Sequence, residues 1–353
     1  MKNQAFFIVI AVVLISITAV WLVSPDKHTL TEETVNYTAT ADEPSWEIQE
    51  LNSAPTPSQN LQEPETVETL SAKDSALFVA SVYAAELTHP AYSQPLTEHD
   101  WDRLQPNYFN PQSIPVDDEG NELSASLSKY RFMYPEPIVA SLSGEGVQSA
   151  KLVLMDMVSK TTLGETPFER TDGQWTARLK GKEDMPPQVQ AVVKAEVRGK
   201  IIPIVLALKY LKSVATLEGF ENAESQGADM VLPAKINALE KGLFRLRANL
   251  YDVHDKPVAH LVGKTRLDTG EGKLELKAHQ SVLIGKEGPF HLKTFVLELM
   301  SPKPGVSTRY GHSQIDKFEI ENFSVSSLAT TAYEPSEQEK QRLKLLENMA
   351  SGN

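Results

Sequence analysis

The chain contains no cysteine among its 353 residues. Disulfide bonds and thiolate zinc sites are therefore excluded, as is acyl attachment of the lipoprotein type. Basic residues are also few: 34 Lys and Arg stand against 47 Asp and Glu, which gives a formal net charge of −13. Because binding to phosphate backbones needs a basic face, this balance argues against a nucleic-acid partner.

Recognisable catalytic motifs are missing as well. No two of the eight histidines are four residues apart, as in helical zinc hydrolase sites, and there is no Gly-x-Ser-x-Gly elbow and no glycine-rich phosphate loop. Acidic clusters at 99–102, 117–121 and 252–255 could offer metal ligands, but a helix start and polar turns are the favoured explanation of them. The sequence therefore predicts no catalytic residue, no cofactor and no metal site.

One long apolar run is present, at residues 5 to 23. It carries no charge, and its only polar side chains are Ser16 and Thr18. Nineteen residues at ~1.5 Å each give ~28 Å of helix, close to the ~30 Å hydrocarbon layer of a membrane. A cleaved secretory signal would have an apolar region of ~7–15 residues and a small-x-small site, whereas Ile17 lies two positions before Ala19. The run predicts a retained transmembrane anchor.

Charge predicts the orientation of this anchor. Only Lys2 precedes it, whereas residues 24–75 carry eleven Asp or Glu against Lys27 and Lys73. By the positive-inside rule, residues 1–4 stay in the cytoplasm. We therefore predict a single-pass inner-membrane protein whose bulk is periplasmic. Residues 24–70 are rich in Pro, Thr, Glu, Ser and Asn and predict a disordered acidic linker.

Residues 71–132 predict a helical junction. Apolar residues at helical spacing, among them Leu77, indicate a first helix over 75–88, ended by Pro90. A second helix is expected from Thr97 as N-cap to a stop at Pro106.

Aromatic residues gather in the same junction. Such residues can stack on sugar rings or bind a partner, and the alternative is packing onto the following β-domain. The residues that we single out as possible partner or ligand contacts are Tyr92, Trp101, Tyr108 and Phe109.

The rest of the chain predicts strands separated by turn residues. Residues 133–210 should form one β-sandwich, with strands at 138–142, 150–158, 175–179, 189–197 and 201–211. Residues 211–331 should form a second, with strands at 228–236, 243–251, 258–267, 273–283, 290–299, 314–320 and 323–328. In the second of these strands Phe244 and every other residue to Leu250 are apolar, which predicts one buried and one wet face.

A bulge and a C-terminal helix are also predicted. A phase slip near Ser281 suggests a bulge. Residues 332–353 should end the chain as a helix, in which Ser336 and Glu339 form a capping box.

Several short stretches of the sequence resemble stretches of a known class of domains. The succession GEGKLELKAH and GKEGPFHLKTFVLEL, with Gly288-Pro289-Phe290 opening a late strand, resembles the immunoglobulin- and fibronectin-III-like modules of bacterial envelope proteins. YPEPIVASLSG and DGQWTARL look more loosely like a second such module. The chain departs from the pattern at 252–255, where the turn lacks glycine, and it has no cysteine pair between sheets. The resemblance implies adhesion, spacing or partner binding rather than chemistry, and fold alone does not license more.

These observations lead to one functional expectation and two alternatives. We expect a mainly β, membrane-anchored envelope protein that acts through two tandem Ig-like domains as a noncatalytic interaction or structural module, its partner another envelope protein or the cell wall. One alternative is a carbohydrate or cell-wall processing enzyme with a site at the interdomain cleft. The other is a secreted substrate-binding accessory protein, which requires cleavage of the first segment.

Overall fold

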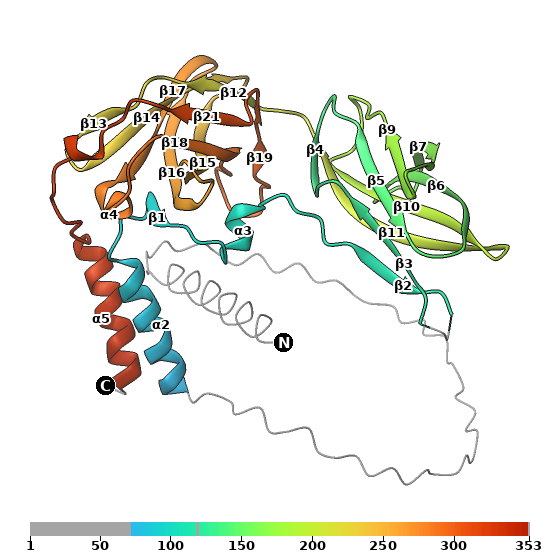
Figure 1. Ribbon diagram of the computed structural model, residues 1–353, viewed down its shortest axis with the longest axis horizontal. Helices are drawn as coiled ribbons and strands as arrows, with labels where there is room; N and C mark the ends of the chain where they lie inside the picture. Colours follow the sequence, from blue (N-terminus) through green and yellow to red (C-terminus); the bar gives the residue numbers. More distant parts are fainter. Residues whose placement is uncertain (1–71, 118–119, 352–353) are drawn as a thin grey trace, which may run out of the picture. The chain divides into compact units, whose positions relative to one another are not determined.

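The computed structural model describes residues 72–117 and 120–351, and this part of the chain is mainly β, as predicted (Figure 1). The predicted anchor at 5–23 and linker at 24–70 lie outside the described residues. Among the helices from residue 72 onward, none is long and apolar enough to cross a bilayer. The strands form two pairs of sheets, and each pair encloses a hydrophobic core of its own.

The first sandwich packs two five-stranded sheets together. One sheet runs, in spatial order, β2 (Gln112–Pro115), β3 (Glu122–Leu127), β5 (Ile138–Ser143), β9 (Gln174–Leu179) and β8 (Glu169–Thr171). The other runs β4 (Arg131–Met133), β11 (Lys200–Leu211), β10 (Gln188–Val197), β6 (Val147–Asp156) and β7 (Thr162–Pro167). The two-residue turn Arg198-Gly199, with φ of 52° and 74°, sets the register of β10 and β11, because such turns match the twist of a hairpin.

The second sandwich holds the larger core. One of its sheets runs β1 (Ser93–Pro95), β16 (Pro257–Leu267), β15 (Gly242–Tyr251), β18 (Phe290–Leu299) and β19 (Arg309–Tyr310), with β21 (Lys317–Ile320) also on β18. The other runs β13 (Glu224–Gln226), β14 (Asp229–Ala238), β12 (Ala215–Phe220) and β20 (His312–Ser313), with β17 (Gly270–His279) also on β14. The predicted core face of β15 is confirmed, since Phe244, Leu246, Ala248 and Leu250 are all 0% exposed.

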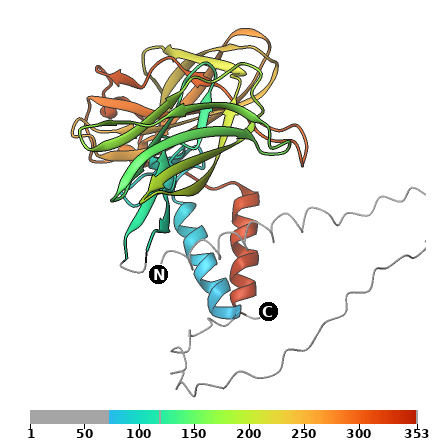
Figure 2. The ribbon, with the colours of Figure 1, turned by 90° about the vertical axis from the view of Figure 1, so that its right-hand side faces the viewer.

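The first and last described helices form a pair. Helix α2 (Ala72–Glu86) and helix α5 (Glu337–Ser351) lie side by side and run in opposite directions (Figures 1 and 2). The predicted capping box begins α5: the backbone N–H and hydroxyl of Ser336 both donate to the Glu339 carboxylate at 2.7 Å, and the Glu339 N–H donates to the Ser336 hydroxyl.

Several local predictions were wrong. The expected helix from Thr97 is instead the short helix α3 (Trp101–Leu104), because the Asp100 carboxylate accepts from the Thr97 N–H and hydroxyl at 2.7 Å and closes a separate turn. The expected bulge at Ser281 is helix α4 (Gln280–Leu283), capped by the His279 ring, which accepts from the Ser281 N–H. The strand expected at 323–328 is a 3₁₀ turn, η2 (Val325–Ser327).

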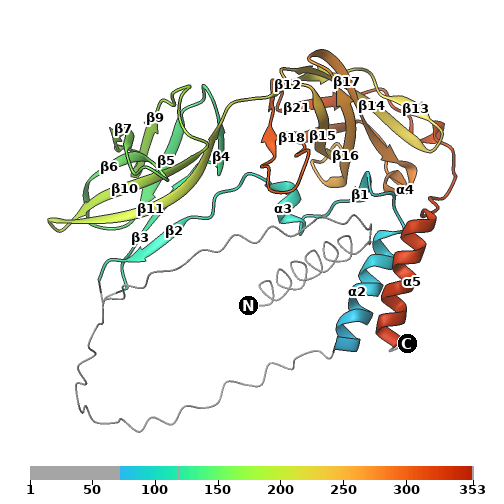
Figure 3. The same ribbon diagram turned by 180° about the vertical axis from the view of Figure 1, so that it is seen from behind.

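The segment 71–132 also differs from the helical junction that we predicted. It contains α2 and α3, but it supplies strand β1 to the second sandwich and β2, β3 and the start of β4 to the first (Figure 3). Strands β1 and β2 have only three and four residues, too few to show an apolar alternation. Strand β3 does alternate, with Leu123, Ala125 and Leu127 buried, and our sequence prediction missed it. Leu77 departs from the expected packing of α2, because 60% of it is exposed.

Candidate functional site

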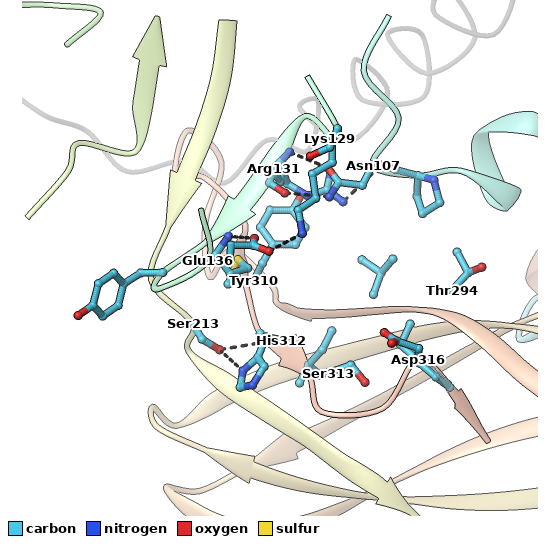
Figure 4. Close-up of a pocket in the computed structure, with 18 of the residues that line it drawn as sticks. Asn107, Lys129, Arg131, Glu136, Ser213, Thr294, Tyr310, His312, Ser313 and Asp316 are labelled. Carbon is cyan, nitrogen blue, oxygen red and sulfur yellow. Dashed lines mark hydrogen bonds and ion pairs between the residues drawn. The ribbon is translucent and has the colours of Figure 1, made fainter. Parts of the chain in front are cut away.

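A cleft of about 720 Å³ opens beside strand β4 (Figure 4). Its walls come from the loop that follows α3, from the chain around β4, and from β18, β19 and β20 of the second sandwich. These segments are far apart in the sequence, so the cleft exists only in the folded chain.

One wall depends on how α3 is held against the second sandwich. Asn249 lies on the outer face of β15 but is 0% exposed, because α3 covers it. Its amide donates to the Arg103 carbonyl at 2.7 Å, and its oxygen pairs with Nδ1 of His260 at 2.7 Å. Burial, with the charges of Arg103 and Arg247 beside the ring, lowers the pKa of His260 to about 4. The imidazole is therefore neutral at physiological pH.

Asn107 joins the same wall to β4. Its amide donates to the Arg131 carbonyl at 2.9 Å, and its side-chain oxygen accepts from the Arg131 N–H at 2.6 Å. The amide thus takes the place of a neighbouring strand and fixes the backbone from which the Arg131 side chain extends into the cleft (Figure 4).

The Arg131 guanidinium lies over the ring of Tyr310, 4.5 Å from its centre. One of its nitrogens, Nη2, donates to the Pro106 carbonyl at 3.3 Å. A guanidinium stacked on an aromatic ring keeps its remaining N–H groups at its edges, where they can bind a carbonyl or carboxylate.

Several other polar groups of the cleft are bonded to each other or to the backbone, whereas the exposed carboxylate of Asp316 has no such partner among the described residues. Lys129 forms an ion pair with Glu136 at 2.5 Å. The Ser213 hydroxyl donates to the Ala215 carbonyl at 2.7 Å and accepts from the backbone N–H of His312 at 3.1 Å. The His312 ring Nδ1 is farther from this hydroxyl, at 3.4 Å, so the hydroxyl proton is directed to the carbonyl and not to the ring.

The four aromatic residues that the sequence singled out have different surroundings. Trp101 and Tyr108 are 53% and 46% exposed and lie edge to face, with ring centres 6.0 Å apart. Tyr108 also lines the cleft. Phe109 is buried in the core of the first sandwich. Tyr92 donates its hydroxyl to the Asp229 carboxylate at 2.8 Å, and burial together with Asp229 raises its pKa.

His260, His279 and His291 do not come together, although His279 and His89 contact the same Ser281 hydroxyl, at 2.9 and 2.8 Å. His260 pairs with Asn249, His279 pairs with Ser281, and His291 contacts Asp255 at 2.5 Å. Asp255 also binds Lys293, and these two partners lower its pKa. Throughout residues 72–117 and 120–351, no three His, Asp or Glu side chains are grouped so that they could hold a metal ion.

The local acidic clusters contribute to turns. The Asp252 carboxylate accepts from the backbone N–H groups of His254 and Lys256, at 2.8 and 3.0 Å. Asp117 accepts from the Asn121 amide at 2.9 Å and forms an ion pair with Arg198 at 3.1 Å.

Comparison with known proteins gives no family. No family model and no curated protein matches the chain. A DUF4785 family protein from Legionella pneumophila is structurally similar at a TM-score of 0.36 and 14% identity over 50% of this chain. Salmonella alpha-2-macroglobulin reacted with methylamine is similar at a TM-score of 0.30 and 11% identity over 60% of this chain. The chain spans about half (52%) of the first protein and 15% of the second, and similarity at this level assigns no function.

Sequence reasoning missed most of the cleft. Arg131, Tyr310 and Asn107 belong to segments with no motif, and their proximity depends on how the chain folds. The clustering of aromatic residues near position 100 was the one useful signal, because it marked the loop that forms one wall.

Proposed function

We propose that this protein is a membrane-anchored envelope protein whose two immunoglobulin-like domains bind a partner without catalysing a reaction. The cleft beside β4 carries the proposal, with Tyr108 in its lining, the exposed Trp101 against Tyr108, and Arg131 stacked on Tyr310 inside it. Aromatic residues and arginine are the side chains that most often dominate binding energy at protein interfaces.

The bonding within the cleft favours binding over catalysis. Lys129 and Glu136 neutralise each other, and the Ser213 hydroxyl is occupied by a backbone carbonyl. An acid or base that acts on a substrate needs a free proton or lone pair in reach of it. Among the residues described, the cleft offers rings, guanidinium edges and the carboxylate of Asp316, with no second acid and no nucleophile hydrogen-bonded to that carboxylate, and these groups suit a protein segment or a cell-wall glycan.

Crosslinking tests the cleft. A photoreactive residue is placed at Tyr108 in the full chain, and at Val158 as a control, since Val158 is 87% exposed on a turn of the first sandwich. In the cell of origin we expect a discrete adduct from position 108 and none from position 158. With the captured partner purified, Trp101→Ala should weaken binding at least about tenfold, as for an interface hot spot.

Two results would count against this function. Equal adducts from both positions would show that the cleft is not selective. Conversion of the captured partner by the wild-type protein, lost in Arg131→Ala, would show an enzyme instead.

The proposed anchor has a separate test. The positive-inside pattern and the apolar run at 5–23 support an inner-membrane location with the bulk of the chain in the periplasm. The intact mass of protein extracted from membranes should include residues 5–23. A mature protein that begins after residue 20 would make it a secreted protein.

A further inference from the structure

Exposed apolar side chains are concentrated on the helix pair α2 and α5. Five of the sixteen large hydrophobic residues exposed in the described part of the chain lie on these two helices: Leu77, Phe78, Val82, Leu345 and Met349. Only Ala80 and Ala350 of the pair are buried. Val79 and Tyr83 of α2, with Leu343 and Leu346 of α5, are half-buried, so the pair covers part of its large apolar side chains and leaves the five named above exposed.

Four of the five exposed residues share one side of the pair. At 3.6 residues per turn, Phe78 and Val82 form one line along α2, and Leu345 and Met349 form one along α5. The covered side of each helix is marked by buried and half-buried apolar residues, among them Val79, Ala80 and Tyr83 on α2, and Leu343, Leu346 and Ala350 on α5. Relative to the middle of these two sets, at about 100° per residue, both exposed lines are displaced in the same rotational sense. The helices run in opposite directions (Figure 2). Two lines that are rotated in the same sense on antiparallel helices lie on the same side of the pair. Phe78, Val82, Leu345 and Met349 thus make one apolar face, with Phe78 at its outer edge, whereas Leu77 is on the opposite side.

Charge argues against a membrane as the occupant of this face. Four basic residues on the two helices stand against five acidic ones. Helices that lie on anionic bilayers carry a surplus of Lys and Arg on their polar side, and this pair has none. A surface with both acidic and basic side chains is instead compatible with a protein partner whose surface also carries both.

We propose that the apolar face pairs with the same face of a second copy of this chain, which forms a four-helix bundle. A two-fold pairing is self-complementary, so apolar residues meet apolar residues and the Lys and Arg of α5 can meet Glu of the partner. Each helix is ~22 Å long, and two helices ~9 Å apart offer ~400 Å² per copy, about half of a standard interface. The structure therefore predicts a weak dimer.

The absence of cysteine allows a direct test on the full chain. Single variants Val82→Cys, Met349→Cys and Leu77→Cys are purified and treated with a short bis-maleimide over a range of protein concentrations. The purified chain is used alone, so the outcome does not depend on the cleft or on insertion in a membrane. We expect Val82→Cys and Met349→Cys to give covalent dimers at least about fivefold more than Leu77→Cys, the matched control on the same helix pair.

A second variant separates pairing from general stickiness. In the Met349→Cys background, Val82→Glu should lower the dimer yield to that of the control, whereas Leu77→Glu should leave it unchanged. Equal dimer yields at Val82, Met349 and Leu77, or none at any of them, would overturn the proposal. So would flotation of the chain with anionic vesicles that Val82→Glu abolishes, which would make the face a membrane contact.

Discussion

Buried polar side chains lie on the outer face of the second sandwich, where alternation alone predicts exposed ones. Asn249 is 0% and Glu298 is 2% exposed. Glu298 accepts from Arg245 at 2.5 Å and from Arg247 at 2.9 Å. A buried carboxylate is tolerated when it is paired in this way, and removing one partner of such a pair is strongly destabilising. These contacts, with those of Asn249, hold the face on which α3 lies.

His260 should make this region sensitive to acid. Its pKa of about 4 in the folded chain is below the 6.5 of an ordinary histidine. Between these values the unfolded chain binds a proton that the folded chain does not, so stability is present above pH 6.5 and falls as the pH is lowered through 4. At 1.36 kcal/mol per pH unit, the loss is at most about 3 kcal/mol.

Hydrogen exchange of the β15 and β16 amides between pH 6.5 and 4 measures this effect. His260→Gln keeps a polar partner for Asn249 and should flatten the decline in opening free energy. His254→Gln is the matched control, because His254 is exposed on a turn. If His260→Gln and His254→Gln change the decline equally, the acid sensitivity comes from other groups.

For the candidate site, the sequence predicted the aromatic cluster but not which of its residues would be buried. Trp101 and Tyr108 belong to the aromatic cluster that was predicted, and their rings are neighbours, but only Tyr108 lines the cleft. Phe109 belongs to the same cluster but is in a core. Neighbouring aromatic residues look alike in a sequence, and only the fold decides which one is covered.

Long central strands were predictable at the scale of elements, and short edge strands were not. The strands predicted at 189–197 and 243–251 lie at 188–197 and 242–251. Each has a sheet neighbour on both sides and one buried face. Because every second side chain points to that face, apolar and polar residues alternate in the sequence. By contrast, β13 is wholly exposed and β2 has one apolar side chain, so backbone pairing alone defines them.

Of the three helices predicted within the described residues, those at 75–88 and after Ser336 are present as α2 and α5, and only the one from Thr97 to Pro106 was wrong. Helix α3 has only four residues and is fixed by the Asp100 turn and by the bond between Asn249 and the Arg103 carbonyl. Helix α5 has a capping box, which is a local signal, and it was predicted near its observed start. Its partner α2 is distant in the sequence, so their pairing could not be read from either one.

At the scale of the whole molecule, the two hydrophobic cores share no residue. Strand β11 ends at Leu211 in the first sandwich, and strand β12 begins at Ala215 in the second. Separate cores joined by a short segment are expected to unfold as separate cooperative units.

Calorimetry of core variants tests this independence. Leu154 of the first core and Leu232 of the second are both 0% exposed, and replacing either with alanine should cost about 2–5 kcal/mol because it leaves a cavity. Each substitution should lower one of two thermal transitions by roughly 8 °C or more and leave the other within error, since ~1 kcal/mol shifts the Tm of a domain of ~100 residues by several degrees. Val158→Ala, on an exposed turn, should move neither. If Leu154→Ala and Leu232→Ala shift one common transition, the two sandwiches stabilise each other. The cleft between β4 and β19 would then be the expected place of that coupling, because Arg131 and Tyr310 make contact across it.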